Sequence, residues 1–250
     1  KAFQFQALTS LEGHIRALEA ETGSATGYRR CGRVMPITSE DKLLHQKLRV
    51  EESLTRWQSA DTGFTYKLDD PNTHATWLTP ATAPYGVVYE TLSARVAPQA
   101  YLNTVAASLT GPLKNNTDLL IGQGFTGYDE AKRQVRLANG DTFTADKVVL
   151  ANGYAAFDKI SEMTGEQVGS GEKGQALLIE GSGLEAMPAV YCDGLYVVPH
   201  DDHTVAVGST AERDFTDATP NETQAEALAE RIRVMAARAL ECTPEQGRLE

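Results

Sequence analysis

The sequence predicts an α/β (α+β) fold in which helices accompany a mixed or antiparallel sheet. Three observations lead to this prediction. Segments with apolar residues at helical spacing alternate along the chain with short runs rich in β-branched residues. Residues 148–151 form a continuous apolar run, which is typical of a strand covered on both faces. Several further short runs after residue 174 indicate a second sheet.

The composition is that of a globular protein with a real core. Hydrophobic residues make up 41% of the 250 residues, and 34 acidic against 23 basic side chains give a net charge of -11. A field of this sign repels phosphate backbones and anionic lipid, so we do not expect a nucleic-acid partner. No apolar run approaches the roughly 18 residues that a membrane span needs. The 3 cysteines lack CxxC spacing, which favours a reducing, cytoplasmic compartment over disulfides or zinc.

The first elements are expected to be two helices separated by a strand. The capping box at residues 9–12 should begin a short helix that ends at Gly23. A strand is expected over residues 28–37. Ser39 should begin a longer helix, whose apolar residues are expected to face the core. These residues are Leu44, Leu48, Leu54 and Trp57.

The next stretch, residues 61–86, fits either a functional loop or a pair of short strands, because it is too long for a simple connection. Residues 87–89 should be extended. Pro98 suits the first position of a helix with three apolar residues on one face. These are Leu102, Val105 and Leu109.

The second half is expected to be mostly strands, at residues 119–121, 125–128 and 148–151. A hairpin should form around Asn139-Gly140, between residues 134–137 and 142–143. Further strands are expected at 175–179, 190–191, 195–198 and 205–207. A last helix is expected over 221–240, with Leu228, Ile232, Met235 and Leu240 along one stripe.

Local motifs predict no metal site and no catalytic nucleophile. His200-Asp201-Asp202-His203 is a dense group of ligand-type side chains, but it lies at an expected hairpin tip and lacks a third ligand group. Gly-x-Ser-x-Gly, the frame of a nucleophile elbow, is absent. Gly122-Gln123-Gly124 follows an expected strand, but no helix follows that would direct its positive end at a pyrophosphate.

A series of motifs follows in a fixed order over nearly the whole chain. Near the start, Glu21-Thr22-Gly23 precedes Tyr28-Arg29-Arg30-Cys31-Gly32-Arg33-Val34. Ala94-Arg95-Val96-Ala97-Pro98, Phe125-Thr126-Gly127-Tyr128 and Asp146-Lys147-Val148-Val149-Leu150-Ala151-Asn152-Gly153 follow. The last are Lys173-Gly174-Gln175, Gly194-Leu195-Tyr196-Val197-Val198-Pro199 and Val205-Ala206-Val207-Gly208-Ser209-Thr210. In this order the motifs resemble the flavin-dependent superfamily of D-amino-acid oxidase, glycine oxidase and sarcosine oxidase.

The resemblance implies an enzyme that oxidises the C–N bond of an amino acid or secondary amine by hydride transfer to FAD. The cofactor carries this redox chemistry, so no catalytic side chain is expected. The implied domains are a substrate-binding domain at residues 1–93 and 165–250 and part of an FAD-binding domain at 94–164. The family's glycine-rich phosphate loop and its carboxylate-binding arginine lack counterparts here, so we expect an internal fragment, inactive and without tightly bound FAD. Lys1 at the start and a vector-like Leu249-Glu250 at the end accord with this expectation.

The resemblance also assigns candidate site residues. Substrate-binding candidates are Tyr196, Thr210 and Ala211, and cofactor-binding candidates are Phe125, Ala151, Asn152, Gly153, Gly174 and Gln175. For Tyr196 the alternative is a tyrosine packed on a half-buried strand. Three arginines that could bind an anion, Arg29, Arg30 and Arg33, are expected to be solvent-exposed instead.

Two positions depart from the family pattern, because Ala155 replaces an aromatic residue and His200 replaces a basic one. The expected partner is a small amine or amino acid, and the sequence gives no oligomeric state. The alternative function is a non-catalytic binding or interaction module derived from the same fold. An enzyme of this type should have a mixed sheet with an open face, whereas a binding module should have a closed pocket.

Overall fold

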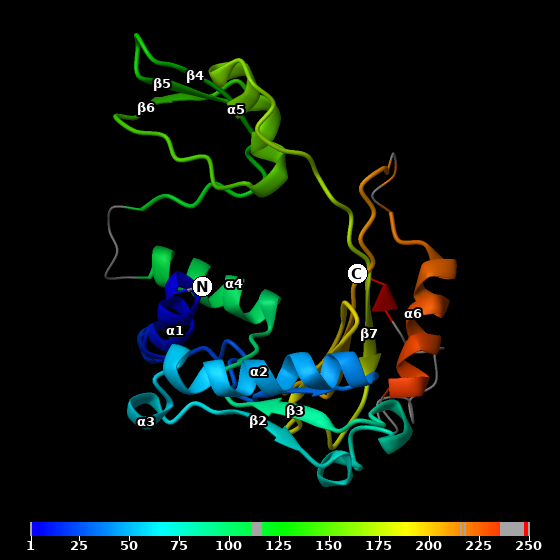
Figure 1. Ribbon diagram of the computed structural model, residues 1–250. Coiled ribbons are helices and arrows are strands. Elements are labelled where there is room, and N and C mark those ends of the chain that lie inside the picture. The colour runs from blue at the N-terminus through cyan, green and yellow to red at the C-terminus, as the bar shows by residue number, and fades with distance from the viewer. Residues whose placement is uncertain (1, 112–116, 216, 218, 236–247, 250) are drawn as a thin grey trace. The chain divides into compact units, whose positions relative to one another are not determined.

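The computed structural model describes residues 2–111, 117–215, 217, 219–235 and 248–249 (Figure 1). The chain divides into two compact units: residues 1–108 with 173–250 form the first, and residues 109–172 form the second. Each unit contains a sheet and helices. The α/β prediction is therefore confirmed.

The first unit is built on a mixed sheet of 8 strands. Its order is β11 (Arg248–Leu249), β7 (Ala176–Glu180), β10 (Thr204–Gly208), β9 (Leu195–Pro199), β8 (Ala189–Cys192), β1 (Arg33–Pro36), β3 (Val87–Glu90) and β2 (Tyr66–Asp69). The pairing of β1 with β8 is parallel, and the other pairings are antiparallel. Strands from the start and the end of this unit therefore meet at the centre of the sheet.

One face of this sheet carries the hydrophobic core. Side chains alternate between the two faces of a strand, and Val197, Val205 and Val207 all point to the same side. Helix α6 (Glu222–Met235) covers them with Leu228. The helix predicted over 221–240 is observed as far as Met235, and Leu240 lies outside the described residues.

Helix α2 (Glu40–Arg56) covers the opposite face of the sheet at the β2 end. It begins at the predicted cap, where the Ser39 hydroxyl accepts a hydrogen bond from the Lys42 amide. It packs against β2 and encloses a small cluster that contains Met35 and Val88. Within the described residues of the first unit, the same face at β7, β9 and β10 forms the floor of a pocket.

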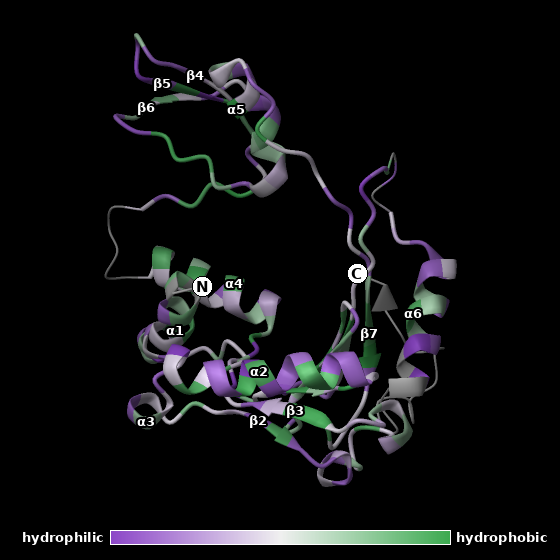
Figure 2. Cartoon of the chain, viewed as in Figure 1, coloured by the Kyte–Doolittle hydropathy of each residue, from purple (hydrophilic) through white to green (hydrophobic). Residues whose placement is uncertain are grey.

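The predicted orientation of α2 is wrong. Leu44, Leu48 and Leu54 are 64%, 55% and 65% exposed, and Leu43 contacts the core cluster instead. Figure 2 shows both hydrophobic and hydrophilic residues along this helix. Packing on the sheet selected a face that the leucine spacing did not indicate.

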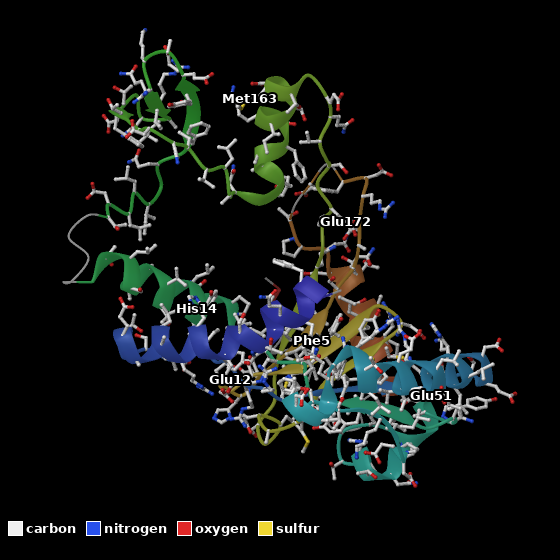
Figure 3. The ribbon with its side chains drawn as sticks, turned by 60° about the vertical axis from the view of Figure 1, so that its left-hand side comes forward. Phe5, Glu12, His14, Glu51, Met163 and Glu172 are labelled. Carbon is white, nitrogen blue, oxygen red and sulfur yellow. The ribbon has the colours of Figure 1, made fainter. Side chains whose placement is uncertain are left out.

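Helix α1 (Ala2–Thr22) begins earlier than predicted. The Thr9 and Ser10 hydroxyls bond to carbonyls 3 residues back inside the helix, so the sequence at 9–12 does not cap it. The helix ends before Gly23, as predicted. Glu12 reaches Arg30 with an oxygen–nitrogen distance of 3.1 Å, whereas His14 is exposed; both are labelled in Figure 3.

The stretch 61–86 contains one strand, β2, with a short helix before it and two 3₁₀ turns after it. Helix α3 (Ser59–Thr62) precedes it, and the 3₁₀ turns η1 (Pro71–His74) and η2 (Pro80–Thr82) follow it. The turns deliver Trp77 and Leu78 into the main core, where both are almost fully buried. This segment is therefore a core-building connection.

Helix α4 (Pro98–Thr110) follows β3 and begins at Pro98, as predicted. Leu102 and Leu109 are exposed on it, so its predicted apolar face is not buried. Among the described residues, no helix has both the length and the apolarity to cross a membrane. Cys31 and Cys192 are free thiols, and Cys242 lies outside the described residues.

The second unit contains a sheet of β4 (Phe125–Asp129), β5 (Gln134–Leu137) and β6 (Thr142–Thr144). The predicted turn at Asn139-Gly140 joins β5 to β6, and Gly140 has the positive φ of 89° that such a turn requires. The turn η3 (Gly153–Ala156) and helix α5 (Phe157–Thr164) follow. The hairpin prediction is confirmed.

Two predicted strands of this unit, at 119–121 and 148–151, are not observed. Ile121 is 80% exposed and Val149 is 85% exposed, and neither segment pairs with another strand among the described residues. An apolar strand needs neighbours on both sides to satisfy its backbone and bury its side chains. The described part of this unit provides none for these segments.

Gly32 is expected to be essential for the junction between β1 and β3. Its φ is +69°, and a Cβ there would lie 2.6 Å from the Glu90 carbonyl oxygen. Gly23 has the same φ of +69° but open space around it. Gly23→Ala should therefore lower the free energy of unfolding by about 1–2 kcal/mol, and Gly32→Ala should lower it by roughly a further 1–3 kcal/mol. Urea unfolding measures both, and equal losses would contradict the steric argument.

Candidate functional site

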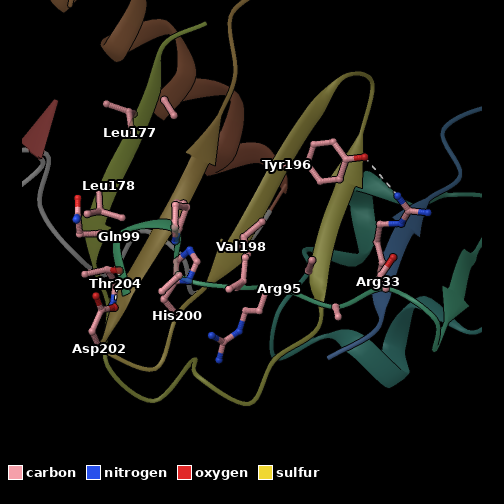
Figure 4. A pocket seen from close by; sticks show the side chains of 18 of the residues that line it. Arg33, Arg95, Gln99, Leu177, Leu178, Tyr196, Val198, His200, Asp202 and Thr204 are labelled. Atoms are coloured by element: carbon pink, nitrogen blue, oxygen red, sulfur yellow. Dashed lines mark hydrogen bonds between the residues drawn. The ribbon is translucent and has the colours of Figure 1, made fainter. Parts of the chain in front are cut away.

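A pocket of about 610 Å³ lies on the open face of the large sheet (Figure 4). Its floor is made by small and apolar side chains, among them Leu178, Val198 and Ala206. One wall is the segment 93–98 with the first turn of α4. The pocket belongs to the first unit alone, and its floor is the side of β7, β9 and β10 that the core does not use.

Arg33 and Tyr196 stand at one end of this pocket. The Arg33 Nη1 donates a hydrogen bond to the Tyr196 hydroxyl at 3.3 Å, shown as a dashed line in Figure 4. Tyr196 is 42% exposed, and its ring lies 4.5 Å from the Tyr191 ring on the neighbouring strand. The Arg33 guanidinium also lies over the Tyr191 ring, at 5.7 Å from its centre. A guanidinium and a phenol hydroxyl, both hydrogen-bond donors, therefore lie together at an accessible end of the pocket.

The position of Arg33 is set by a buried carboxylate. Its Nε lies 3.1 Å from an oxygen of Glu90, the residue directly opposite on β3. Glu90 is only 1% exposed, and it accepts hydrogen bonds from the amides of Leu92 and Ser93 at 2.8 and 3.0 Å and from the Ser93 hydroxyl. A carboxylate with so many partners is rigid, and it holds the arginine from behind. The outer edge of the guanidinium remains directed to the pocket.

His200 is a neutral, buried histidine in the same pocket. It is 7% exposed, and its Nδ1 has no hydrogen-bond partner among the described residues. Burial lowers the pKa of His200, and the nearby positive charge of Arg95 lowers it further. An uncharged imidazole with an unused nitrogen can accept or donate a hydrogen bond to a ligand without introducing charge.

The four residues of the His-Asp-Asp-His cluster have separate roles. Asp201 bonds to the buried Arg95 at 2.6 Å, and Asp202 accepts bonds from the amide and hydroxyl of Thr204, while His203 contacts Glu185. Arg95 also donates to the Gly27 carbonyl, so this turn is joined to the start of the chain. In the described parts of the chain, no group of ligand-type side chains is arranged to hold a metal ion.

The predicted substrate residues fall into two places. Tyr196 lines the pocket, while Thr210 and Ala211 lie beyond the end of β10 and do not line it. The Thr210 hydroxyl accepts a hydrogen bond from the Gln175 amide and donates one to Glu212, and Ala211 is exposed. Their contact with a ligand stays a prediction.

Gly174 and Gln175 form the entry to β7. Gln175 is buried, its side-chain amide donates to Glu212 at 2.7 Å, and its side-chain oxygen accepts from the Asn221 amide. Both ends of this side chain are therefore used within the protein. The backbone amide and carbonyl of Gln175 are also bonded, to the hydroxyl and the amide of Thr210. The predicted cofactor contact of these two residues stays a prediction.

The remaining cofactor candidates belong to the second unit. Phe125 begins β4 and is half-buried, and Ala151, Asn152 and Gly153 are exposed in the turn before α5. Gly153 has a φ of +61° with open space around it, so its backbone is approachable. Their roles stay predictions.

The glycine run at 122–127 does not form a phosphate cradle. Gly122, Gly124 and Gly127 have the G-x-G-x-x-G spacing, but the chain continues from them through β4, and the motif requires a helix. The positive end of a helix is therefore not available here for a diphosphate.

Sequence reasoning missed Arg33 as a site residue. The prediction of exposed arginines is wrong for Arg30 and Arg33, whose side chains are 16% and 25% exposed. Arg30 donates to the Leu92 and Leu8 carbonyls and is structural. Arg33 is distinguished by standing in a strand with the apolar residues Val34 and Met35, opposite a glutamate at the end of the neighbouring strand β3. This pairing is visible only once the register of the two strands is known.

The chain belongs to a family of FAD-dependent oxidoreductases, because the family model described as FAD dependent oxidoreductase matches residues 4–247. No curated protein sequence matches the chain. The resemblance to this family found in the sequence is confirmed.

Solved structures with this fold include several oxidases. A glycine oxidase from Geobacillus kaustophilus is 17% identical with a TM-score of 0.74, over 95% of this chain and 62% of that one. A glycine oxidase from Bacillus cereus is 17% identical with a TM-score of 0.77, over 98% and 67%. An iminodiacetate oxidase from Chelativorans sp. BNC1 is 16% identical with a TM-score of 0.72, over 98% and 66%. The chain thus spans about two thirds of these proteins or less.

The described residues meet part of what FAD requires. The pocket offers an apolar floor beside hydrogen-bonding groups, which suits one face of a flavin ring. The diphosphate requires a strand, a glycine-rich turn and a helix N-terminus, and the described residues do not combine these three parts. The chain therefore fits the ring end of the cofactor and not its phosphate end.

The lowered pKa of His200 should make the stability of the first unit depend on pH. Below the ordinary histidine pKa of about 6.5, the unfolded chain binds a proton that folded His200 resists, so stability falls as the pH falls. His200→Gln should reduce this loss between about pH 7.5 and pH 5.5. Urea unfolding followed by tryptophan fluorescence measures it, and exposed His14→Gln is the control. An unchanged slope in His200→Gln would contradict the assignment.

Proposed function

We propose that this chain is the substrate-binding part of an FAD-dependent enzyme that oxidises the C–N bond of an amino acid or secondary amine. The observation that carries the proposal is the pair of Arg33 and Tyr196 at the rim of an open pocket, with Arg33 held by the buried Glu90. A guanidinium and a phenol at this place suit a substrate carboxylate. The open, mixed sheet supports an enzyme over a self-contained binding module.

The residues of the pocket would bind and orient the substrate. Arg33 and Tyr196 would hold the carboxylate, and the apolar floor at Val198 and Ala206 would exclude water from the reacting carbon. His200, whose pKa is lowered by burial, also lines this pocket. FAD, when bound, supplies the acceptor for the hydride that leaves the amine-bearing carbon.

The FAD domain is proposed to include residues 94–164, with contacts from Phe125, Ala151, Asn152 and Gly153 in the whole protein. Residues 1–93 and 165–250 are proposed to form the substrate domain. The family and the motif order support this division, and the protein is proposed to act in the cytoplasm.

Conservative changes at the Arg33–Tyr196 pair should weaken carboxylate binding. Arg33→Lys keeps the charge opposite Glu90 but loses the planar fork, so affinity for carboxylates should fall about tenfold. Tyr196→Phe removes one hydrogen bond and should lower the affinity for carboxylates roughly three- to tenfold. Calorimetric titration with glycine, sarcosine and D- and L-alanine measures the affinities. Arg233→Gln, an exposed arginine of α6, is the control, and equal affinity in Arg33→Lys and the control would refute the role.

The 250-residue chain by itself should hold no tightly bound FAD and should not oxidise amines. Without a helix N-terminus behind a glycine-rich turn, the diphosphate lacks its main donors, and the net charge of -11 repels it. Absorbance and fluorescence after addition of FAD, followed by assays with amino acids, test this. A stoichiometric yellow complex that substrate reduces would overturn the prediction.

A further inference from the structure

A second recess of about 420 Å³ lies beside the pocket, between α2 and the sheet. Helix α2 contributes Arg49, Glu52 and Arg56, and the sheet contributes aromatic residues. Arg33 and Tyr196 line both the pocket and the recess. A ligand held by Arg33 can therefore extend past Tyr196 into this second space.

The charges of the recess are not balanced. Arg33 is paired with Glu90, and Arg56 Nη1 lies 3.1 Å from Glu52. No carboxylate in the described chain lies within ion-pair distance of Arg49, which interacts with the Tyr66 hydroxyl. The recess is thus locally positive in a chain whose net charge is -11.

Aromatic side chains form one part of the lining of the recess. Trp57 and Tyr66 meet edge to face at 5.4 Å between ring centres, and Tyr191 packs on Tyr196 at 4.5 Å. Met35 is nearly buried beneath them. These side chains offer contact to the methylene groups of a ligand.

We propose that this recess binds a second carboxylate of the substrate, so that the enzyme prefers amino acids with an acidic side chain. The proposal rests on the proposed function, which places the first carboxylate at Arg33. Arg49 is the specificity residue, because its charge has no carboxylate partner among the described residues. Glu52 opposes the same ligand, because it repels an anion and engages Arg56.

The test compares glutamate with glutamine, which has nearly the same shape without the charge. Both enantiomers are titrated into the full 250-residue chain near neutral pH, by calorimetry and by tryptophan fluorescence. Trp57 lines the recess, whereas Trp77 is buried in the core and reports little. A Trp57→Phe variant identifies the source of the signal. We expect glutamate to bind roughly five- to twentyfold more tightly than glutamine.

Two substitutions in α2 are expected to change the preference for glutamate in opposite directions. Arg49→Gln should remove the preference for glutamate and leave glutamine binding unchanged. Glu52→Gln should increase the preference about two- to fivefold, because a repelling charge is removed and Arg56 is released. Lys47→Gln changes the same charge on the same helix outside the recess and serves as the control.

The outcomes separate the two proposals. Equal binding of glutamate and glutamine, with both weakened by Arg33→Lys, would overturn the second-carboxylate site and leave the proposed function standing. A glutamate preference that Arg49→Gln and Lys47→Gln reduce equally would also overturn it. Absence of binding by any amino acid would refute the proposed substrate site, and this inference with it.

Discussion

The buried carboxylate of Glu90 is the interaction on which the site depends. Removing a carboxylate from water costs several kcal/mol unless its oxygens are satisfied, and here two amides, a hydroxyl and a guanidinium do so. These partners come from β1 and from the segment after β3, which is also a wall of the pocket. The same group therefore joins two strands, shapes the wall and holds Arg33 at the rim.

The second constraint is the partial cover of one sheet face. The core face is covered by α6 and by Trp77, whereas in the described part of the first unit α2 covers the other face at the β2 end. Because side chains alternate along a strand, every residue of β9 belongs either to the core or to the open face. Val197 is in the core, and Tyr196 and Val198 line the pocket.

The sequence predicted the elements whose signals are local. Ser39 caps α2, Gly140 turns the hairpin, and the strands predicted after residue 174 are observed. Sequence-based prediction failed where the structure of a segment depends on the elements packed beside it. Leu44 and Leu48 look like core residues by spacing, but the sheet accepts another face of the helix. The runs at 119–121 and 148–151 are apolar enough for strands and find no partner strand among the described residues.

The site shows the same division between local and distant information. Tyr196 could be predicted because a family motif surrounds it, and a motif is a local signal. Arg33 could not, because its meaning depends on Glu90, which lies opposite in the sheet but far along the chain. Gln175 is a cofactor-binding candidate by its motif, but only its hydrogen bonds to Glu212 and Asn221 reveal that its side chain is already occupied.

Net charge and local charge give opposite expectations for an anionic ligand, and distance decides between them. Screening at physiological ionic strength acts over about 8 Å, so most of the chain's negative charges contribute little at the pocket. A guanidinium about 4 Å away interacts with a carboxylate by about 4 kcal/mol at an effective dielectric constant near 20. Arg33 and Arg49 lie in the lining itself, and they therefore outweigh the remote surplus of acidic residues.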